Sequence, residues 1–220
     1  MLNELLFLSH CIVIALFSLI SLSLGPSALV AFICTQCILA NIFVLKQMTL
    51  FGLTATCADA FTVGATLGLN LLQEYFGKET AKRAIVINFA LLIFYLVVSQ
   101  IHLLYVPAYG DSTQYHFAAL LEFMPRIVIA SFSVYFFVQM LDYYLYGFLK
   151  KKYADKHLIL RNYCSIALCQ LIDTVFFSFL GLWGIVEDVW QIIVVSYCIK
   201  MVSIIITTPF IWLSRKIVTR

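Results

Sequence analysis

The run AIVINFALLIFYLVVSQIHLLYV, from Ala84 to Val106, is the clearest sign of architecture in this chain of 220 residues. A helix that crosses a bilayer needs roughly 20 predominantly apolar residues, and this run is long enough. Six further stretches qualify or nearly qualify: Leu5 to Leu24, Ala28 to Leu45, Leu50 to Leu72, Ile127 to Leu149, Tyr163 to Ile185 and Trp190 to Leu213. Because the connections are short, the sequence predicts one all-α polytopic membrane helix bundle over residues 1–220, with six to seven transmembrane helices.

The composition excludes a water-soluble fold. Hydrophobic residues make up 63% of the chain and charged residues 11%, whereas a soluble domain usually carries about 25% charged residues. The chain has neither a GxxxxGK[ST] phosphate loop nor a GxSxG motif. Its four histidines are dispersed without the spacing of metal ligands. We therefore expect a membrane protein that is not an enzyme and that holds neither a metal nor a cofactor.

Basic residues alternate along the chain with connections that are acidic or poor in cations. They gather at residues 78–83, at residues 150–161 and at the C-terminus from Arg215. By the positive-inside rule these regions face the cytoplasm, which predicts a cytoplasmic C-terminus. We expect a multi-pass protein of a cell membrane, namely a bacterial inner membrane. The third stretch decides between six spans and seven. Gly52, Asp59 and Asn70 interrupt it, which also allows a broken or re-entrant segment.

Two charged residues, Asp173 and Lys200, lie deep within apolar stretches. A charge at the bilayer centre costs at least about 2.5 kcal/mol, so such residues persist where they find partners or serve a function. Residues spaced three or four apart share a helix face, and this spacing gives three polar stripes: Ser131, Tyr135, Gln139, Asp142 and Tyr146; Cys169, Gln170 and Asp173; and Ser196, Lys200, Ser203 and Thr207, with Tyr197 beside them. We expect the three stripes to face one another across a central cavity.

Each of these polar residues also has a purely structural interpretation. Asp173 and Lys200 could form a buried ion pair that only sets the register of two helices. Arg126 and Asp142 lie nearer to helix ends, where contact with water is cheap. Glu74 lies at a helix end, where a solvated surface role is equally open. Because ionisable groups within a membrane are functional by default, we favour a function for Asp173 and Lys200.

Cys34 and Cys37 form a CxxC motif. Such a pair would suit a membrane thiol oxidoreductase that exchanges disulfides with a quinone partner. The pair lies within an apolar helix, however, and no second shuttle pair accompanies it. We rank this function last.

The run NLLQEYFG, from Asn70 to Gly77, is similar to the acidic-xxx-Glu-x-Tyr/Phe-Gly motif of the queuosine-precursor transporter family, although Asn70 stands where that motif has an acidic residue. The chain resembles the family at further positions: Ala40-Asn41, Lys46 and Gly52; Arg126, Ala130-Ser131, Gln139 and Asp142; Gln170 to Thr174 with Phe176; and Tyr197 to Lys200 with Thr208-Pro209. The resemblance covers most of the chain.

The resemblance implies uptake of 7-deazaguanine compounds, namely 7-cyano-7-deazaguanine, 7-aminomethyl-7-deazaguanine or queuine, from which queuosine in transfer RNA is made. It implies no contact with nucleic acid. Secondary transport is the favoured mechanism. The family is also likened to substrate-binding subunits of energy-coupling-factor transporters, so the expected partners besides the substrate and the lipid bilayer are ATPase subunits or further copies of the chain. A structural membrane subunit without a ligand is the remaining interpretation.

The chemistry of a deazaguanine suggests roles for individual residues. The base offers N1–H and an exocyclic amine as adjacent donors, a carbonyl oxygen as an acceptor, and a flat ring. Asp173 or Glu74 would accept the two donors, Lys200 or Gln139 would donate to the carbonyl, and a tyrosine or phenylalanine would cover the ring. The remaining candidate substrate-binding residues are Asn70, Arg126, Asp142, Gln170 and Tyr197.

Overall fold

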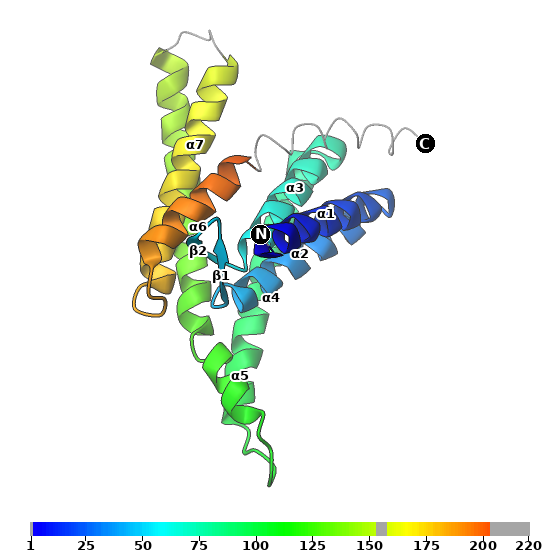
Figure 1. Cartoon of the computed structure of the whole chain (residues 1–220). Helices are drawn as coiled ribbons and strands as arrows, with labels where there is room; N and C mark the ends of the chain where they lie inside the picture. Colours follow the sequence, from blue (N-terminus) through cyan, green and yellow to red (C-terminus); the bar gives the residue numbers. More distant parts are fainter. Residues whose placement is uncertain (1, 153–157, 203–220) are drawn as a thin grey trace.

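The structure is a computed structural model that describes residues 2–152 and 158–202, with side chains except at residues 139, 142–152 and 158–166. Figure 1 shows long helices that form two groups with a small β-hairpin between them. The first group consists of α1 (Leu2–Ser23), α2 (Pro26–Phe43), α3 (Asp59–Phe76) and α4 (Lys78–Leu104). Pro26 begins α2, a position at which a helix needs no N–H donor.

Within the first group, α3 packs closely on α2 because it presents a glycine at the contact. Gly64 is buried, and a Cβ atom at this position would overlap Oε1 of Gln36 on α2 and Cγ2 of Ile14 on α1. Small residues of this kind let membrane helices approach one another. The core of this group is apolar and includes Leu22, Leu29, Ile33, Leu67, Leu71 and Leu72.

A short β-hairpin separates α2 from α3. Strand β1 (Gln47–Leu50) pairs antiparallel with β2 (Leu53–Thr56), so that Gln47 lies opposite Thr56. The turn places Phe51 at φ 51° and Gly52 at φ 80°, the positive values that two-residue hairpin turns require. The hairpin delivers the chain to the start of α3, where Asp59 lies.

The hairpin is tied to helices of both groups. The Nδ2 atom of Asn3 on α1 donates to the carbonyl oxygen of Thr49 at 2.9 Å, and the amide of Thr54 donates to Oε1 of Gln191 at 2.8 Å. These bonds give partners to backbone groups that lie outside helices. The apolar stretch from Leu50 to Leu72 is therefore not one helix, because its first part is hairpin. The expectation of a broken third segment is confirmed.

The second group follows from α4 through the short helix α5. Its members are α5 (Gln114–Leu121), α6 (Met124–Lys152), α7 (Leu158–Phe177), the π-helical turn η1 (Ser178–Leu182) and a last helix described over Val189–Val202. Helices α6 and α7 run side by side (Figure 1). The Val189–Val202 helix packs on the hairpin through Val195, which contacts the cluster of Leu50 and Ala55.

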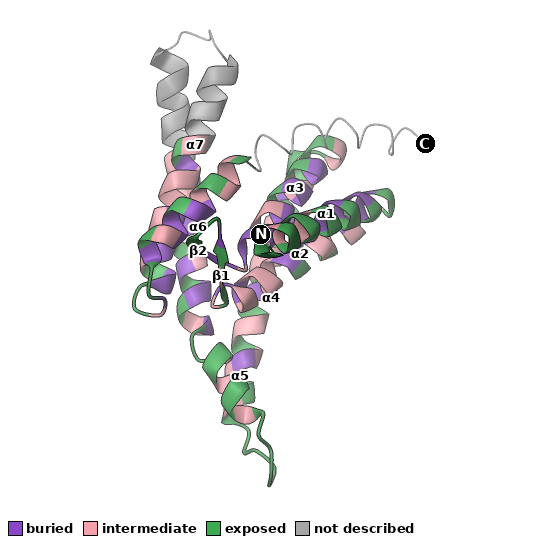
Figure 2. Cartoon of the chain, viewed as in Figure 1, coloured by how far each residue is buried: buried purple, intermediate pink, exposed green. Residues whose placement is uncertain are grey.

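The two groups meet in a shared apolar core. Val44 and Ala58 from the first half pack with Met124, Ile127 and Leu182 from the second. Figure 2 shows the buried residues on helix faces that turn toward one another, while the outer faces are exposed. Many of the exposed side chains are large and apolar, as expected of a surface that faces lipid rather than water.

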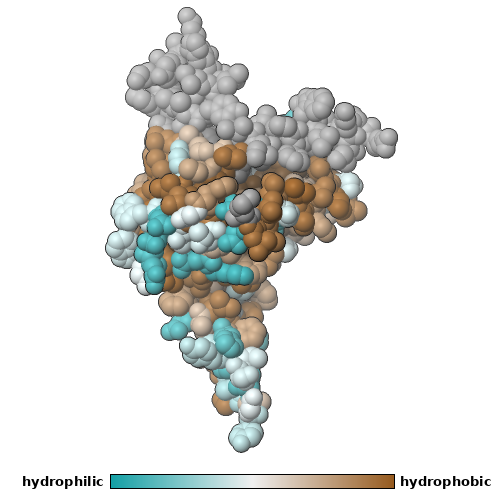
Figure 3. Space-filling model, viewed as in Figure 1, coloured by the Kyte–Doolittle hydropathy of each residue, from teal (hydrophilic) through white to brown (hydrophobic). Residues whose placement is uncertain are grey.

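By length and composition, four of the described helical segments can cross a membrane: Leu2–Ser23, Pro26–Phe43, Lys78–Leu104 and Gln114–Val138. Ala167–Leu182 and Val189–Val202 are shorter apolar helices. Figure 3 shows apolar side chains over the α1 region and hydrophilic ones toward the tip between α4 and α5. The all-α polytopic membrane bundle predicted from the sequence is confirmed, and α3, which carries Asp59 and Glu74, is not among the apolar spans.

Candidate binding cavity

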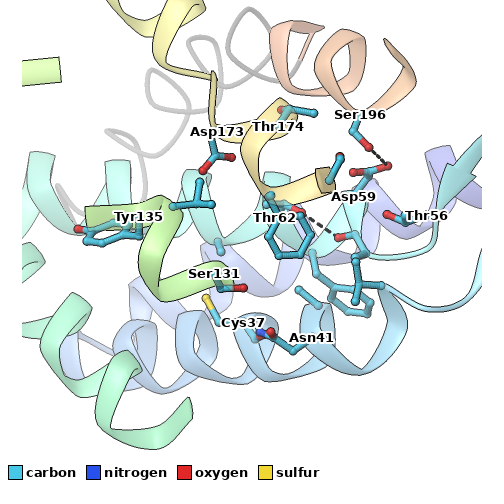
Figure 4. A pocket seen from close by; sticks show the side chains of 18 of the residues that line it. Cys37, Asn41, Thr56, Asp59, Thr62, Ser131, Tyr135, Asp173, Thr174 and Ser196 are labelled. Carbon is cyan, nitrogen blue, oxygen red and sulfur yellow. Dashed lines mark hydrogen bonds between the residues drawn. The ribbon is translucent and has the colours of Figure 1, made fainter. Parts of the chain in front are cut away.

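A cavity of about 270 Å³ lies where the two groups of helices meet. Its lining comes from α2, α3, α4, α6, α7, η1, the Val189–Val202 helix and the end of β2. Ligand pockets usually measure about 300–1,000 Å³, so this space suits a small ligand. Figure 4 shows polar side chains from several of these elements around it. Members of all three polar stripes line it: Ser131 and Tyr135, Asp173, and Ser196 and Lys200.

Asp173 of α7 and Lys200 of the last helix form an ion pair at the cavity. Nζ of Lys200 lies 2.5 Å from Oδ2 of Asp173, and it also donates to Oγ1 of Thr174 at 3.0 Å. The lysine side chain is 15% exposed and the aspartate side chain 31%. Two charges in an apolar bundle are stabilised by each other only when they are close and bonded in this way. The pair thus keeps two charged groups at the cavity wall.

A second carboxylate, that of Asp59, lies in the same wall. Asp59 begins α3, where a negative side chain interacts favourably with the helix dipole. It is 5% exposed, and its Oδ2 accepts a hydrogen bond from Oγ of Ser196 at 3.0 Å. Ser196 lies one helical turn before Lys200, so one face of the last helix contacts both carboxylates. The described lining thus contains two carboxylates and one ammonium group.

Another part of the wall is polar but uncharged. It consists of Cys37 and Asn41 on α2 and Asn88 on α4. Nδ2 of Asn41 donates to the carbonyl oxygen of Cys37 at 2.7 Å. Figure 4 shows Cys37 and Asn41 across the cavity from Asp173. The cavity therefore offers charged groups on one side and amides on the other.

Aromatic rings complete the lining. Phe61, Phe89, Tyr135 and Phe177 border the space. The rings of Phe89 and Tyr135 meet edge to face, with centroids 4.9 Å apart and an interplanar angle of 76°. Such a pair fixes the orientation of both rings.

Several residues predicted from the sequence lie away from this cavity. Asn70 and Glu74 are exposed on the later part of α3, well beyond the residues of that helix that line the cavity. Gln170 precedes Asp173 on α7, and its carbonyl oxygen accepts a hydrogen bond from Thr174. The hydroxyl of Tyr197 donates to the carbonyl oxygen of Ala167 at 3.4 Å. Their roles in substrate binding stay predictions.

Arg126 joins α6 to the end of the π-helical turn. Its Nε donates to the carbonyl oxygen of Leu180 at 2.8 Å, and its Nη2 donates to that of Trp183 at 2.6 Å. These carbonyls lie where η1 ends and have no helical partner beyond it. The side chains of Gln139 and Asp142 lie outside those that the structure describes.

The thiols of the CxxC motif differ in environment. Cys34 is 2% exposed, whereas Cys37 lines the cavity, and both are free cysteines. Among the described residues, no three His, Cys, Asp or Glu side chains come together as metal ligands. The oxidoreductase interpretation finds no support in this arrangement.

Three lining residues with a charged or amide side chain were not predicted from the sequence as site residues. Asp59 is a charged residue within an apolar stretch, and its position in the sequence predicts only an interruption of a span. Asn88 is an amide in the long apolar run from Ala84 to Val106, and Asn41 appears only within a family motif. Each is a polar group where a membrane helix should be apolar, and that signal was available for all three.

Two comparisons with known proteins give matches that cover most of the chain. Residues 56–214 match the model of a family described as "Putative vitamin uptake transporter". A Bacillus subtilis (strain 168) protein named "Probable queuosine precursor transporter" is 32% identical over 212 residues, which cover 95% of this chain and 91% of the relative. No solved structure matches the chain. The extent of both matches shows that the chain belongs to the queuosine-precursor transporter family.

Proposed function

We propose that the chain is a transporter that imports a queuosine precursor of the 7-deazaguanine class and carries out no chemical conversion. The observation that carries this proposal is the polar cavity, in which an otherwise apolar bundle gathers Asp59, Asp173 and Lys200 around a space of about 270 Å³. The name of the Bacillus subtilis relative supports the substrate class. A small cavity with a few polar groups and aromatic rings suits a bicyclic base.

The adjacency of Asp173 and Lys200 matches one edge of the base. Along the six-membered ring of a deazaguanine, the exocyclic amine and N1–H are followed directly by the carbonyl oxygen. Asp173 accepts the two donors and Lys200, held beside it, donates to the carbonyl. Phe89 or Tyr135 covers the ring. Asp173 takes this role rather than Glu74, because Glu74 is exposed outside the cavity.

This arrangement selects against adenine. Adenine offers no N1–H and places an amine where the deazaguanine has its carbonyl, so Lys200 and Asp173 would lose their bonds to the base. A site that leaves buried polar groups unpaired rejects such a ligand strongly.

Transport is coupled to a proton gradient in this proposal. A carboxylate at the cavity can take up a proton on one side of the membrane and release it on the other. The alternative is a substrate-binding subunit that works with separate ATPase subunits of the energy-coupling-factor type. The basic regions support a cytoplasmic C-terminus, and in this proposal residues 1–220 act as a single transmembrane domain, either alone or as a homo-oligomer.

Uptake by the purified chain tests the function. Proteoliposomes with an imposed proton gradient should accumulate labelled 7-cyano-7-deazaguanine, and excess guanine should compete while adenine should not. Accumulation that requires added ATPase subunits would favour the binding-subunit alternative. No uptake under either condition, and no thermal stabilisation by any deazaguanine, would favour a structural subunit, since a ligand that binds the folded state must stabilise it.

A matched pair of variants tests the site. Asp173→Asn should abolish uptake, whereas Glu74→Gln removes a carboxylate outside the cavity and should leave uptake near the wild-type level. The reverse result would assign the role of acceptor to Glu74.

A further inference from the structure

Two amide oxygens in the cavity have no hydrogen-bond partner within the described part of the chain. Oδ1 of Asn41 and Oδ1 of Asn88 are buried, and neither accepts a hydrogen bond from a described residue. Asn41 is only 8% exposed. A carbonyl that leaves water without finding a donor destabilises the protein, and such groups are rare in folded structures. Because both residues line the cavity, these acceptors point to a donor that the cavity receives.

Cys37 interacts with both asparagines and fixes the direction of the Asn41 amide. Nδ2 of Asn41 donates to the carbonyl oxygen of Cys37, one turn earlier on α2, which identifies Oδ1 as the unpaired atom. The Asn88 side chain, which comes from α4, hydrogen-bonds the thiol of the same cysteine. The amide nitrogen of Asn41 is therefore held by α2, and Oδ1 of each asparagine is the atom that has no partner among the described residues and is open to a ligand.

The charged residues of the opposite wall, Asp59, Asp173 and Lys200, already have bonding partners. Asp173 and Lys200 bond to each other, and Asp59 is bonded to Ser196. A ligand at that wall joins groups that already have partners, whereas a ligand at Asn41 and Asn88 satisfies oxygens that have none. The amide wall therefore gains more from a matching donor and loses more from a ligand that lacks it.

We infer that Asn41 and Asn88 form an acceptor wall that binds the pyrrole end of the base, where N9–H of a 7-deazaguanine donates to an amide oxygen. The inference rests on the proposed function, which turns the six-membered ring toward Asp173 and Lys200. N9–H then lies at the other end of the flat ring, on the side where Asn41 stands across the cavity from Asp173 (Figure 4). In a nucleoside N9 carries the ribose and has no hydrogen. The wall thus selects the free base.

The first experiment changes only the ligand. The wild-type chain is titrated with 7-cyano-7-deazaguanine and with its N9-methyl analogue, and both affinities are measured by calorimetry in detergent. The nitrile form is chosen because its only donor at the pyrrole end is N9–H. The methyl analogue should bind at least about tenfold more weakly, as expected for a lost hydrogen bond to a buried acceptor. Equal affinity would overturn the inference.

The second experiment changes the wall. Asn41→Leu and Asn88→Leu remove the acceptors with side chains of similar size, and at least one should weaken binding of 7-cyano-7-deazaguanine by about tenfold. In that variant the N9-methyl analogue and the parent should differ less than in wild type, because the two changes remove the same bond. Undiminished discrimination in both variants would overturn the inference.

Gln36 provides a matched control. Its buried amide on α2 also lacks partners, but it faces Gly64 and does not line the cavity. Gln36→Met should leave both affinities unchanged. The two proposals fail in different ways: a wild-type chain that binds neither compound contradicts the proposed function, whereas one that binds both equally contradicts only the acceptor wall.

Discussion

Lys200 and Asp173 lie 27 positions apart in the sequence, yet Nζ of the lysine is 2.5 Å from Oδ2 of the aspartate. The contact joins α7 to the last described helix at the wall of the cavity. The ion pair either only fixes the register of these two helices or also binds the substrate.

Exchanging the two charges separates these roles. Asp173→Lys with Lys200→Asp keeps an ion pair in place, so thermal stability in detergent should stay close to wild type. Each single variant should lose stability, with a coupling of about 0.5–3 kcal/mol in a double-mutant cycle. Uptake by the exchanged variant should be lost, because the acceptor and donor then face the wrong atoms of the base. Wild-type uptake by that variant would show that the ion pair only fixes the register of the two helices.

Asp59 is the carboxylate best placed to carry a proton. Its bonded partners are the hydroxyl groups of Ser196 and Thr56, so it can become neutral without leaving a lysine unpaired, whereas Asp173 cannot. Asp59→Asn should therefore abolish accumulation driven by a proton gradient while exchange of labelled for unlabelled base across the membrane continues. Asp111→Asn, which changes an exposed carboxylate before α5, is the control. Equal loss of exchange and accumulation in Asp59→Asn would assign Asp59 to substrate binding instead.

Cys37 reports on occupation of the cavity. A small methanethiosulfonate reagent should modify Cys37, which lines the cavity, more readily than Cys34, which is 2% exposed three residues earlier on α2. Bound 7-cyano-7-deazaguanine should slow this modification, as followed by mass spectrometry in single-cysteine variants. Modification at an unchanged rate would place the ligand elsewhere.

The redox interpretation of the CxxC motif is tested by Cys34→Ala. This change removes one thiol without touching the cavity, and uptake should remain at the wild-type level. Loss of uptake together with appearance of a disulfide between Cys34 and Cys37 in the wild type would favour thiol exchange.

Arg126 should act on stability before it acts on binding. Its guanidinium donates to two carbonyl oxygens at the end of η1, and a lysine cannot reproduce this forked geometry. Arg126→Lys should lower the free energy of unfolding by about 1 kcal/mol, a modest value because the residue is exposed. Affinity for the base should change little. Weakened binding without loss of stability would make Arg126 a substrate-binding residue.

The sequence predicted Asp173 and Lys200 as residues of one cavity, but it did not predict Asp59 or the two asparagines there. Asp173, Lys200, Ser196 and Ser131 follow the helical period of three to four residues, and that period alone assigns them to faces. Asn88 stands alone in an apolar run, so periodicity carries no information about it. Only the packing of α4 beside α2 brings it next to Cys37.

The third apolar stretch shows a second limit of the sequence. Its glycines and polar residues predicted a break, but they did not predict a hairpin. The hairpin depends on bonds from Asn3 and Gln191, which are 46 and 137 positions away from their partners. Such distant partners cannot be identified by local pattern.

The sequence by itself determined that this is a membrane protein, because a chain with 63% hydrophobic and 11% charged residues buries its helices in lipid. It also determined that a few polar groups must lie inside, since their cost in a membrane requires partners or a function. The tertiary structure decided which partners these are. It paired Lys200 with Asp173, placed Asp59 beside Ser196, and left the oxygens of Asn41 and Asn88 without a partner among the described residues, because hydrogen bonds depend on distances between helices that helical periodicity does not specify.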